Sequence, residues 1–283
     1  MAEGHAVHGM AARVRRLVDQ PGRSQGPVTE QFDPRALDGR AVAGAEAHGK
    51  HLLIHLHGTD LSPHLHLGMH GAVSVRQHRR ALGPDGLPRT DPPDPAGLAW
   101  RHLTATHLLE VTRPTVCELL DADGRAALHA RLGPDPLRDD ADPAEAIARL
   151  HASRRAIGAL LVDQSVVSGI GNVYRAELLW RAGLDPHTPG NALDPDTLRA
   201  LWDDAFDLMT IGLGAGWIVA HPTQLADARA LLARGEAVPR WPKRYAVYLR
   251  RGEPCPRCGT PVASERLGLQ TMYWCPGCQQ QPA

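Results

Sequence analysis

The sequence has no run of roughly 18 apolar residues, the length that crosses a membrane as a helix. Its first residues, MAEGHAVHGMAARV, also lack the apolar segment of a signal peptide. We therefore expect a cytoplasmic protein with no membrane partner. Net charge is absent too, because 31 basic and 31 acidic side chains cancel. The chain as a whole gives no support for binding a polyanion, so any such partner must be held by local patches.

Cysteine is scarce, with five residues in 283. In a reducing compartment so few cysteines favour metal binding over a disulfide framework. No internal repeat is found. A hydrophobic content of 43% is enough for a real core, and the length predicts two domains or a third small one.

The stretch Asp163 to Pro186, DQSVVSGIGNVYRAELLWRAGLDP, predicts two helices around a glycine hinge. We expect the first helix over Arg154 to Gln164 and the second after the turn SGIGN. The second helix has apolar residues at the spacing of one buried face, and Gly183 is a good stop. A glycine turn before a helix N-terminus suits an anion, phosphate above all, although by itself it is more typical of a tight turn between packed helices.

The N-terminal third predicts an amphipathic helix over Ala6 to Val18 and then strands. Period-two patterns predict antiparallel strands over His51 to His57 and Leu61 to Val73, a loop over Leu82 to Pro95, and further strands from Trp100 to Leu120. The histidines of the first two strands predict a polar sheet face; a metal cluster is the less favoured alternative, because the set lacks matching carboxylates.

The second half predicts a helical domain that starts after the Pro and Asp-rich segment Arg131 to Glu145. Further helices are expected over Pro143 to Leu150 and Pro195 to Ile211, whereas Gly212 to Arg244 has no readable pattern and predicts long loops. We place the domain boundaries at 1–134, 135–245 and 246–283.

The last segment has the most specific pattern, two CxxC pairs separated by sixteen residues. This spacing is typical of a structural zinc site with four thiolate ligands, and the residues between the pairs should form a hairpin. A redox dithiol pair is the alternative. The predicted zinc ligands are Cys255, Cys258, Cys275 and Cys278; Cys117 stands apart and is expected to be a small buried hydrophobe.

The charge around this hairpin is locally positive. One acidic residue, Glu253, stands among Arg240, Lys243, Arg244, Arg250, Arg251 and Arg257. Alone, such a patch is as typical of a solvated face as of a phosphate-binding surface. Next to a zinc hairpin and a helical element with a phosphate-shaped turn, it favours a nucleic-acid partner.

The order of motifs along the chain resembles the formamidopyrimidine-DNA glycosylase and endonuclease VIII family. It begins with Met-x-Glu-Gly, continues through GKHLL, HLGMHG and DQSVVSGIGNVYRAELL, and ends in RRGEPCPRCGTP and YWCPGCQ. The resemblance covers nearly the whole chain and is nearer in look to actinobacterial endonuclease VIII relatives. It implies an α+β fold, with an N-terminal two-layered β-sandwich, a helix-two-turn-helix domain and a C-terminal zinc finger. It also implies that the protein binds damaged DNA as a monomer, in the nucleoid when bound, and flips the damaged base.

The resemblance implies a role for residues across the chain. The family's nucleophile position falls on Ala2, its catalytic glutamate on Glu3 and its motif lysine on Lys50. Implied DNA contacts are Met69, Arg113, Gly171, Asn172, Arg250, Arg251 and Gln270. An α-amine with a pKa near ~7.8 suits attack on a sugar carbon, because a useful fraction is neutral at pH 7.

Two departures from the family pattern bear on activity. Ala2 stands where the family usually has proline, so a free amine requires removal of Met1. Gln270 stands where the family usually has an arginine, and a glutamine donates only neutral hydrogen bonds to a phosphate. We therefore expect a DNA glycosylase for oxidised-pyrimidine, bulky or crosslinked bases with a weaker AP lyase step. The alternative is a catalytically weak lesion or AP-site binding protein of the same fold.

Overall fold

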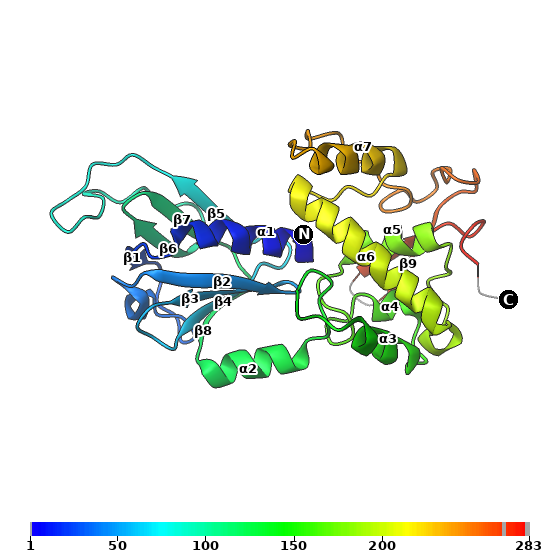
Figure 1. Cartoon of the computed structure of the whole chain (residues 1–283), viewed down its shortest axis with the longest axis horizontal. Helices are drawn as coiled ribbons and strands as arrows, with labels where there is room; N and C mark the ends of the chain where they lie inside the picture. Colours follow the sequence, from blue (N-terminus) through cyan, green and yellow to red (C-terminus); the bar gives the residue numbers. More distant parts are fainter. Residues whose placement is uncertain (1, 268–269, 281–283) are drawn as a thin grey trace. The chain divides into compact units, whose positions relative to one another are not determined.

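The computed structural model describes residues 2–267 and 270–280, so Met1, whose removal a free Ala2 amine requires, lies outside the described residues. The chain divides into two compact units. Among the described residues, the first unit comprises Ala2 and Val7–Ala130, and the second comprises Glu3–Ala6 and those from Arg131 onward (Figure 1). The short segment Glu3–Ala6 therefore belongs structurally to the C-terminal half.

The first unit is built on two four-stranded sheets whose neighbouring strands are all antiparallel. One sheet has the order β1-β6-β7-β5, formed by Gly22–Gln25, Leu98–Thr104, His107–Thr112 and Ala72–Gln77. The other has the order β2-β3-β4-β8, formed by Val42–His48, His51–Leu56, Ser62–His66 and Val116–Leu120. This is the predicted two-layered β-sandwich.

Apolar residues of both sheets form the core of this unit, together with helix α1 (Gly4–Val14). The predicted N-terminal helix is confirmed, with Val7, Ala11 and Val14 buried along one face. Such spacing places one stripe of a helix against the core. The predicted strand Leu61 to Val73 was too long, because a turn at residues 67–71 separates β4 from β5. Gly68 adopts φ +59°, a conformation that suits glycine in that turn.

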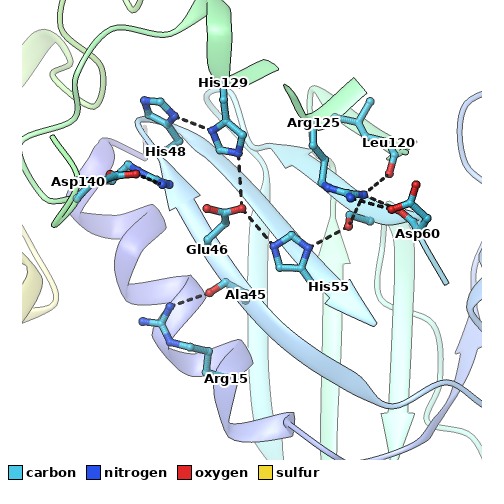
Figure 2. Close-up of polar contacts among 12 residues, drawn as sticks. Arg15, Ala45, Glu46, His48, His55, Asp60, Leu120, Arg125, His129 and Asp140 are labelled. Carbon is cyan, nitrogen blue, oxygen red and sulfur yellow. Dashed lines mark hydrogen bonds and ion pairs between the residues drawn. The ribbon is translucent and has the colours of Figure 1, made fainter. Parts of the chain in front are cut away.

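Histidines of β2 and β3 form a polar network with helix α2 (Ala122–Arg131). Glu46 Oε1 lies 3.2 Å from His55 Nε2 and 3.5 Å from His129 Nε2, and Figure 2 shows it between these two rings. His48 and His129 are joined through their Nδ1 atoms at 2.9 Å. The expected polar sheet face is therefore present, and its histidines pair with each other and with a carboxylate, which holds α2 against the sheet.

The second unit contains the remaining helices: α3 (Pro143–His151), α4 (Ile157–Leu160), α5 (Asn172–Ala182), α6 (Pro195–Ala215) and α7 (Pro222–Ala233). Helices α3 and α6 begin at the prolines where the sequence predicted them, and Asp142 and Asp194 cap them through their side chains. Gly183 ends α5 in the left-handed conformation, also as predicted. None of the described helices has the length and apolar character to span a membrane.

Two predictions for this unit were wrong. The helix expected over Arg154 to Gln164 is reduced to α4, a single turn, because Ala156 is extended and Asp163 begins a new turn. The segment Gly212 to Arg244 was expected to be loops, yet it contains α7. That helix buries only Gln224, Leu225 and Ala228, so its apolar pattern is too weak to be recognised.

The C-terminal segment forms the predicted hairpin from β9 (Ala263–Leu267) and β10 (Gln270–Trp274), which pair antiparallel. Ala176 and Trp180 of α5 share a small apolar cluster with Val262, Cys255 and Cys275 of the hairpin. The hairpin is thus packed directly on α5, the second of the two helices predicted around the glycine hinge.

His102 of β6 gives the first unit a testable acid sensitivity. The side chain is fully buried, neither ring nitrogen makes a well-formed hydrogen bond to a described residue, and burial lowers its pKa to about 4. In the unfolded chain the pKa of this histidine is ~6.5, so between the two pKa values the unfolded state binds the proton and the folded state does not. The free energy of unfolding should therefore fall by about 3 kcal/mol as the pH drops from ~6.5 to ~4. In urea unfolding followed by tryptophan fluorescence, His102→Leu should remove that part of the pH dependence. An unchanged pH profile would contradict the assignment.

Candidate active site and zinc centre

Glu3 lies at the N-terminus of α5, fully buried. Its Oε1 accepts from the backbone N–H of Val173 at 2.9 Å, and its Oε2 accepts from Gly171 at 3.1 Å and Tyr174 at 3.3 Å. These are the N–H groups that the first turn of a helix leaves without intrahelical partners. The carboxylate therefore sits at the positive end of the helix dipole, held in one orientation by three donors.

The turn before α5 is shaped for this carboxylate. A Cβ atom at Gly171 would lie 2.4 Å from Glu3 Cδ, so only glycine allows the approach. Gly169, with φ +92°, accepts from the N–H of Gly4 through its carbonyl at 2.8 Å. The sequence predicted an anion here. In the structure these N–H groups donate to Glu3 of the chain itself, so they are not available to a phosphate.

The side chain of Asn172 is oriented by Arg175, one turn along α5. Arg175 donates to Asn172 Oδ1, and no described residue accepts from the amide nitrogen of Asn172. The Arg175 guanidinium is fully buried and donates to the carbonyls of Gly158 at 3.2 Å and Thr271 at 3.3 Å. Burial lowers its pKa to about 10. Asn172 is thus left with its NH₂ group available to an external acceptor.

Glu177, further along α5, is a second buried carboxylate with three backbone donors. It accepts from the N–H groups of Ala246 at 2.8 Å, Val247 at 3.0 Å and Tyr248 at 3.0 Å. Burial raises its pKa, and the three hydrogen bonds oppose that rise. Glu177 therefore holds the segment that leads into the zinc hairpin against α5.

The four cysteines of the two CxxC pairs converge, as the spacing predicted. Their sulfur atoms all lie within 4.8 Å of one another, with Cys255 to Cys278 at 3.7 Å and Cys258 to Cys275 at 3.4 Å. A tetrahedral zinc with ~2.3 Å bonds separates its sulfur ligands by about 3.8 Å, so the cluster fits that ion. Trp180 donates through Nε1 to Cys255 Sγ at 3.3 Å, which ties the centre to α5. Cys117, in β8, is half-buried and packs against the sandwich core.

The hairpin residues expected to contact DNA differ in their availability. Arg250 is engaged, because its Nε lies 2.8 Å from Glu253 Oε2 and its Nη1 donates to the Ala246 carbonyl at 2.9 Å. Arg251 is exposed, and among the described residues its side chain has no ion-pair or hydrogen-bond partner. Gln270 begins β10, and its Oε1 is buried without a described partner.

Lys50, Met69 and Arg113 belong to the first unit and lie on turns next to β3 and β4. Lys50 is in the turn before β3, and its charge helps burial to lower the pKa of His66. Met69 is 66% exposed. The neighbouring loop that holds the exposed Arg113 is joined to β4 by the N–H of Thr115, which donates to the His66 carbonyl at 2.8 Å. These turns therefore gather three of the predicted site residues.

Comparison with known proteins agrees with this arrangement. Residues 1–125 match the model of the formamidopyrimidine-DNA glycosylase N-terminal domain, 132–221 match its H2TH domain, and 252–281 match the zinc finger found in FPG and IleRS. Endonuclease 8 1 of Mycobacterium tuberculosis is 40% identical over 283 residues, covering 99% of this chain and 100% of the relative. The chain belongs to the formamidopyrimidine-DNA glycosylase and endonuclease VIII family.

Other members of this family are similar over the same length. The formamidopyrimidine-DNA glycosylase of Laribacter hongkongensis is 31% identical over 281 residues, which is 98% of this chain and 96% of the relative. The Lactococcus lactis enzyme, solved with DNA containing an AP site, has the same fold, with a TM-score of 0.76 and 21% identity over 99% of this chain and 100% of that one. Formamidopyrimidine-DNA glycosylase and endonuclease VIII enzymes are DNA glycosylases and AP lyases, and this family member is a zinc-containing DNA repair enzyme of that class.

Arg175 and Glu177 are site residues that the sequence reasoning missed. A charged side chain on a predicted helix is normally assigned to solvent. Here all residues from Asn172 to Trp180 are buried, so this part of α5 has no solvent face. The charges of Arg175 and Glu177 within an apolar pattern were the available signal, but a charged residue on a predicted helix does not by itself show whether it is buried or exposed.

Proposed function

We propose that the protein removes a damaged base from DNA and then cleaves the strand, using the amine of Ala2 as nucleophile and Glu3 as proton carrier. The observation that carries the proposal is the fixed position of Glu3. Its buried carboxylate is held by three backbone donors and follows Ala2 directly in the chain. Because Ala2 and Glu3 are consecutive residues, the nucleophilic amine of Ala2 lies next to the carboxyl group of Glu3.

The proposed chemistry begins with the amine of Ala2, exposed after removal of Met1. Its lone pair attacks C1′ of the damaged nucleotide, and the bond to the base breaks with its electron pair on the base. The opened sugar and the amine form a Schiff base, from which the 3′ phosphate leaves by elimination. The Glu3 carboxyl group protonates the sugar oxygen as the ring opens, and its carboxylate accepts a proton during elimination.

We further propose that Asn172 and Arg251 hold the DNA backbone. The Asn172 amide is oriented with its NH₂ group available, and Arg251 is an exposed cation beside the zinc hairpin. Met69 and Arg113 lie on adjacent exposed turns, which suits residues that fill the space left by a flipped base. We propose an oxidised pyrimidine, or a bulky or crosslinked base, as the substrate.

The experiment that tests the nucleophile is borohydride trapping on abasic DNA followed by mapping of the adduct with mass spectrometry. The chain has only two lysines, Lys50 and Lys243, so besides them only the α-amine can form the Schiff base. We expect the adduct on Ala2. An adduct on Lys50 would assign the nucleophile to Lys50 instead of Ala2. Retention of Met1 in a fully active protein would exclude the Ala2 amine.

The second candidate is a lesion or AP-site binding protein with little chemistry. Ala2 and Gln270, which depart from the family pattern, favour it. A base-release assay separates the two, because a binding protein would retain affinity for abasic DNA and release no base. We expect base release, with strand cleavage the slower step because Gln270 offers the phosphate no charge.

A further inference from the structure

An open pocket of about 590 Å³ lies in the second unit where the start of α7 meets the segment before the zinc hairpin. Its lining includes His221, Lys243, Arg244, Tyr245 and Tyr248. None of these residues has a role in the function proposed above. Since His221 precedes Pro222 as the N-cap of α7, the positive end of a 12-residue helix also faces this region.

The backbone that carries Lys243 and Arg244 is fixed on both sides. Before them, the Pro242 carbonyl accepts from Gln224 Nε2 of α7 at 3.0 Å. After them, the N–H groups of Ala246 and Val247 donate to Glu177. The two cations are therefore presented from a held segment, which lowers the entropy lost when they bind a partner.

Lys243 and Arg244 bring positive charge to this pocket that no described residue neutralises. Lys243 and Arg244 are exposed and have no ion-pair or hydrogen-bond partner within 2–267 and 270–280. Glu253, the one acidic residue of the lining, is already paired with Arg250 at 2.8 Å. Burial lowers the pKa of His221, and the charges of Arg244 and Arg250 lower it further, as expected where positive potential is high.

The walls of the pocket add aromatic surface. Tyr245 and Tyr248 meet edge to face, with ring centroids 5.3 Å apart. Leu249, at the rim, is 64% exposed and held at φ +58°, an unusual conformation for a leucine. Free cations beside aromatic rings and an exposed apolar side chain are the combination that binds a nucleic-acid strand through its phosphates and sugars or bases.

We propose that this pocket, through Lys243 and Arg244, is a second binding site for the DNA phosphate backbone, separate from the Asn172 turn. The inference deepens the proposed function, since it rests on DNA as the substrate. It also gives this chain, whose net charge is zero, local cations for a polyanionic partner.

The test compares the K243Q/R244Q variant with the native protein on a duplex containing a tetrahydrofuran abasic analogue. Binding is measured by fluorescence anisotropy over a range of salt concentrations. If both cations neutralise phosphates, the slope of log K against log salt should become shallower by about 1.8, or ~0.9 for each phosphate that is no longer neutralised. R79Q/R80Q is the matched control, because it removes two cations from the segment after β5, and its slope should stay native. An unchanged slope in K243Q/R244Q would overturn the proposal.

Amine labelling provides a second readout that needs no variant. With only Lys50 and Lys243 present, acetylation of each lysine can be followed separately by mass spectrometry. The abasic duplex should protect Lys243, and inorganic phosphate at the same ionic strength should not. Protection by inorganic phosphate alone would assign the pocket to a free anion and overturn the DNA assignment. Trapping at Ala2 under saturating protein should survive in K243Q/R244Q, so failure of the pocket and failure of the nucleophile are distinguishable.

Discussion

Glu3→Gln should lower base excision by about 10² to 10⁴-fold, the usual contribution of a positioned acid or base. Glutamine keeps the size of the side chain but cannot deliver or accept the proton. Its NH₂ group also faces an N–H donor at α5, since both Glu3 oxygens now accept from that helix. We therefore expect a further loss of about 1 to 3 kcal/mol in unfolding free energy. Single-turnover base release at saturating protein measures the chemical effect without the effect on affinity.

Glu177→Gln is the control for the structural part of this effect. Glu177 is as buried as Glu3, lies on the helix that holds Glu3 and accepts from three backbone N–H groups, yet it is not adjacent to the Ala2 amine. The two variants should lose similar stability, measured by urea unfolding, while only Glu3→Gln loses the rate of base release. Equal loss of rate in both variants would show that Glu3 acts through the position of α5 and not through its proton.

Removal of zinc should unfold the C-terminal hairpin and abolish most DNA binding. Structural zinc contributes about 10 to 16 kcal/mol to small zinc-dependent folds at pH 7. The hairpin has little other stabilisation, because its apolar cluster consists of a few residues, and two of these, Cys255 and Cys275, are themselves zinc ligands. Hydrogen exchange should rise in β9 and β10 and in the segment that Glu177 holds, while the strands of the sandwich keep their protection.

The cysteines provide a matched pair of variants for this prediction. Cys258→Ser removes one ligand of the four and should release the metal, measured as zinc per chain and as DNA affinity. Cys117→Ser changes the one cysteine outside the cluster and should retain both. If the protein still binds DNA with native affinity after a chelator has removed the zinc, the role of the hairpin as a DNA contact is contradicted.

Local patterns were sufficient to predict much of this molecule. The glycine-stopped helix α5, the starts of α3 and α6, and the four-cysteine hairpin were recognised because their signals lie within a few neighbouring residues. The length of α4 was overestimated, because a run of good helix formers does not show where tertiary contacts hold the backbone in an extended conformation. Helix α7 was missed because few of its residues are buried.

The details of the site depended on contacts that no local pattern contains. A phosphate was the anion favoured at the turn before α5, but the N–H groups there donate to Glu3. No local pattern could show this, because Glu3 and its donors are separated by 168 to 171 residues. The same holds for Glu177, whose donors lie 69 to 71 residues away. For both carboxylates, the sequence showed the charge and the fold supplied the partner.

The long separation between Glu3 and α5 also orders events during synthesis. A ribosome delivers the N-terminus first, yet the donors to Glu3 emerge only after more than half of the chain has been made. Contacts so distant in sequence form late, after the intervening segments have folded. The N-terminus of a nascent or truncated chain would therefore lack its positioned carboxylate. An incomplete copy of this enzyme would be inactive on DNA until α5 is made and folded.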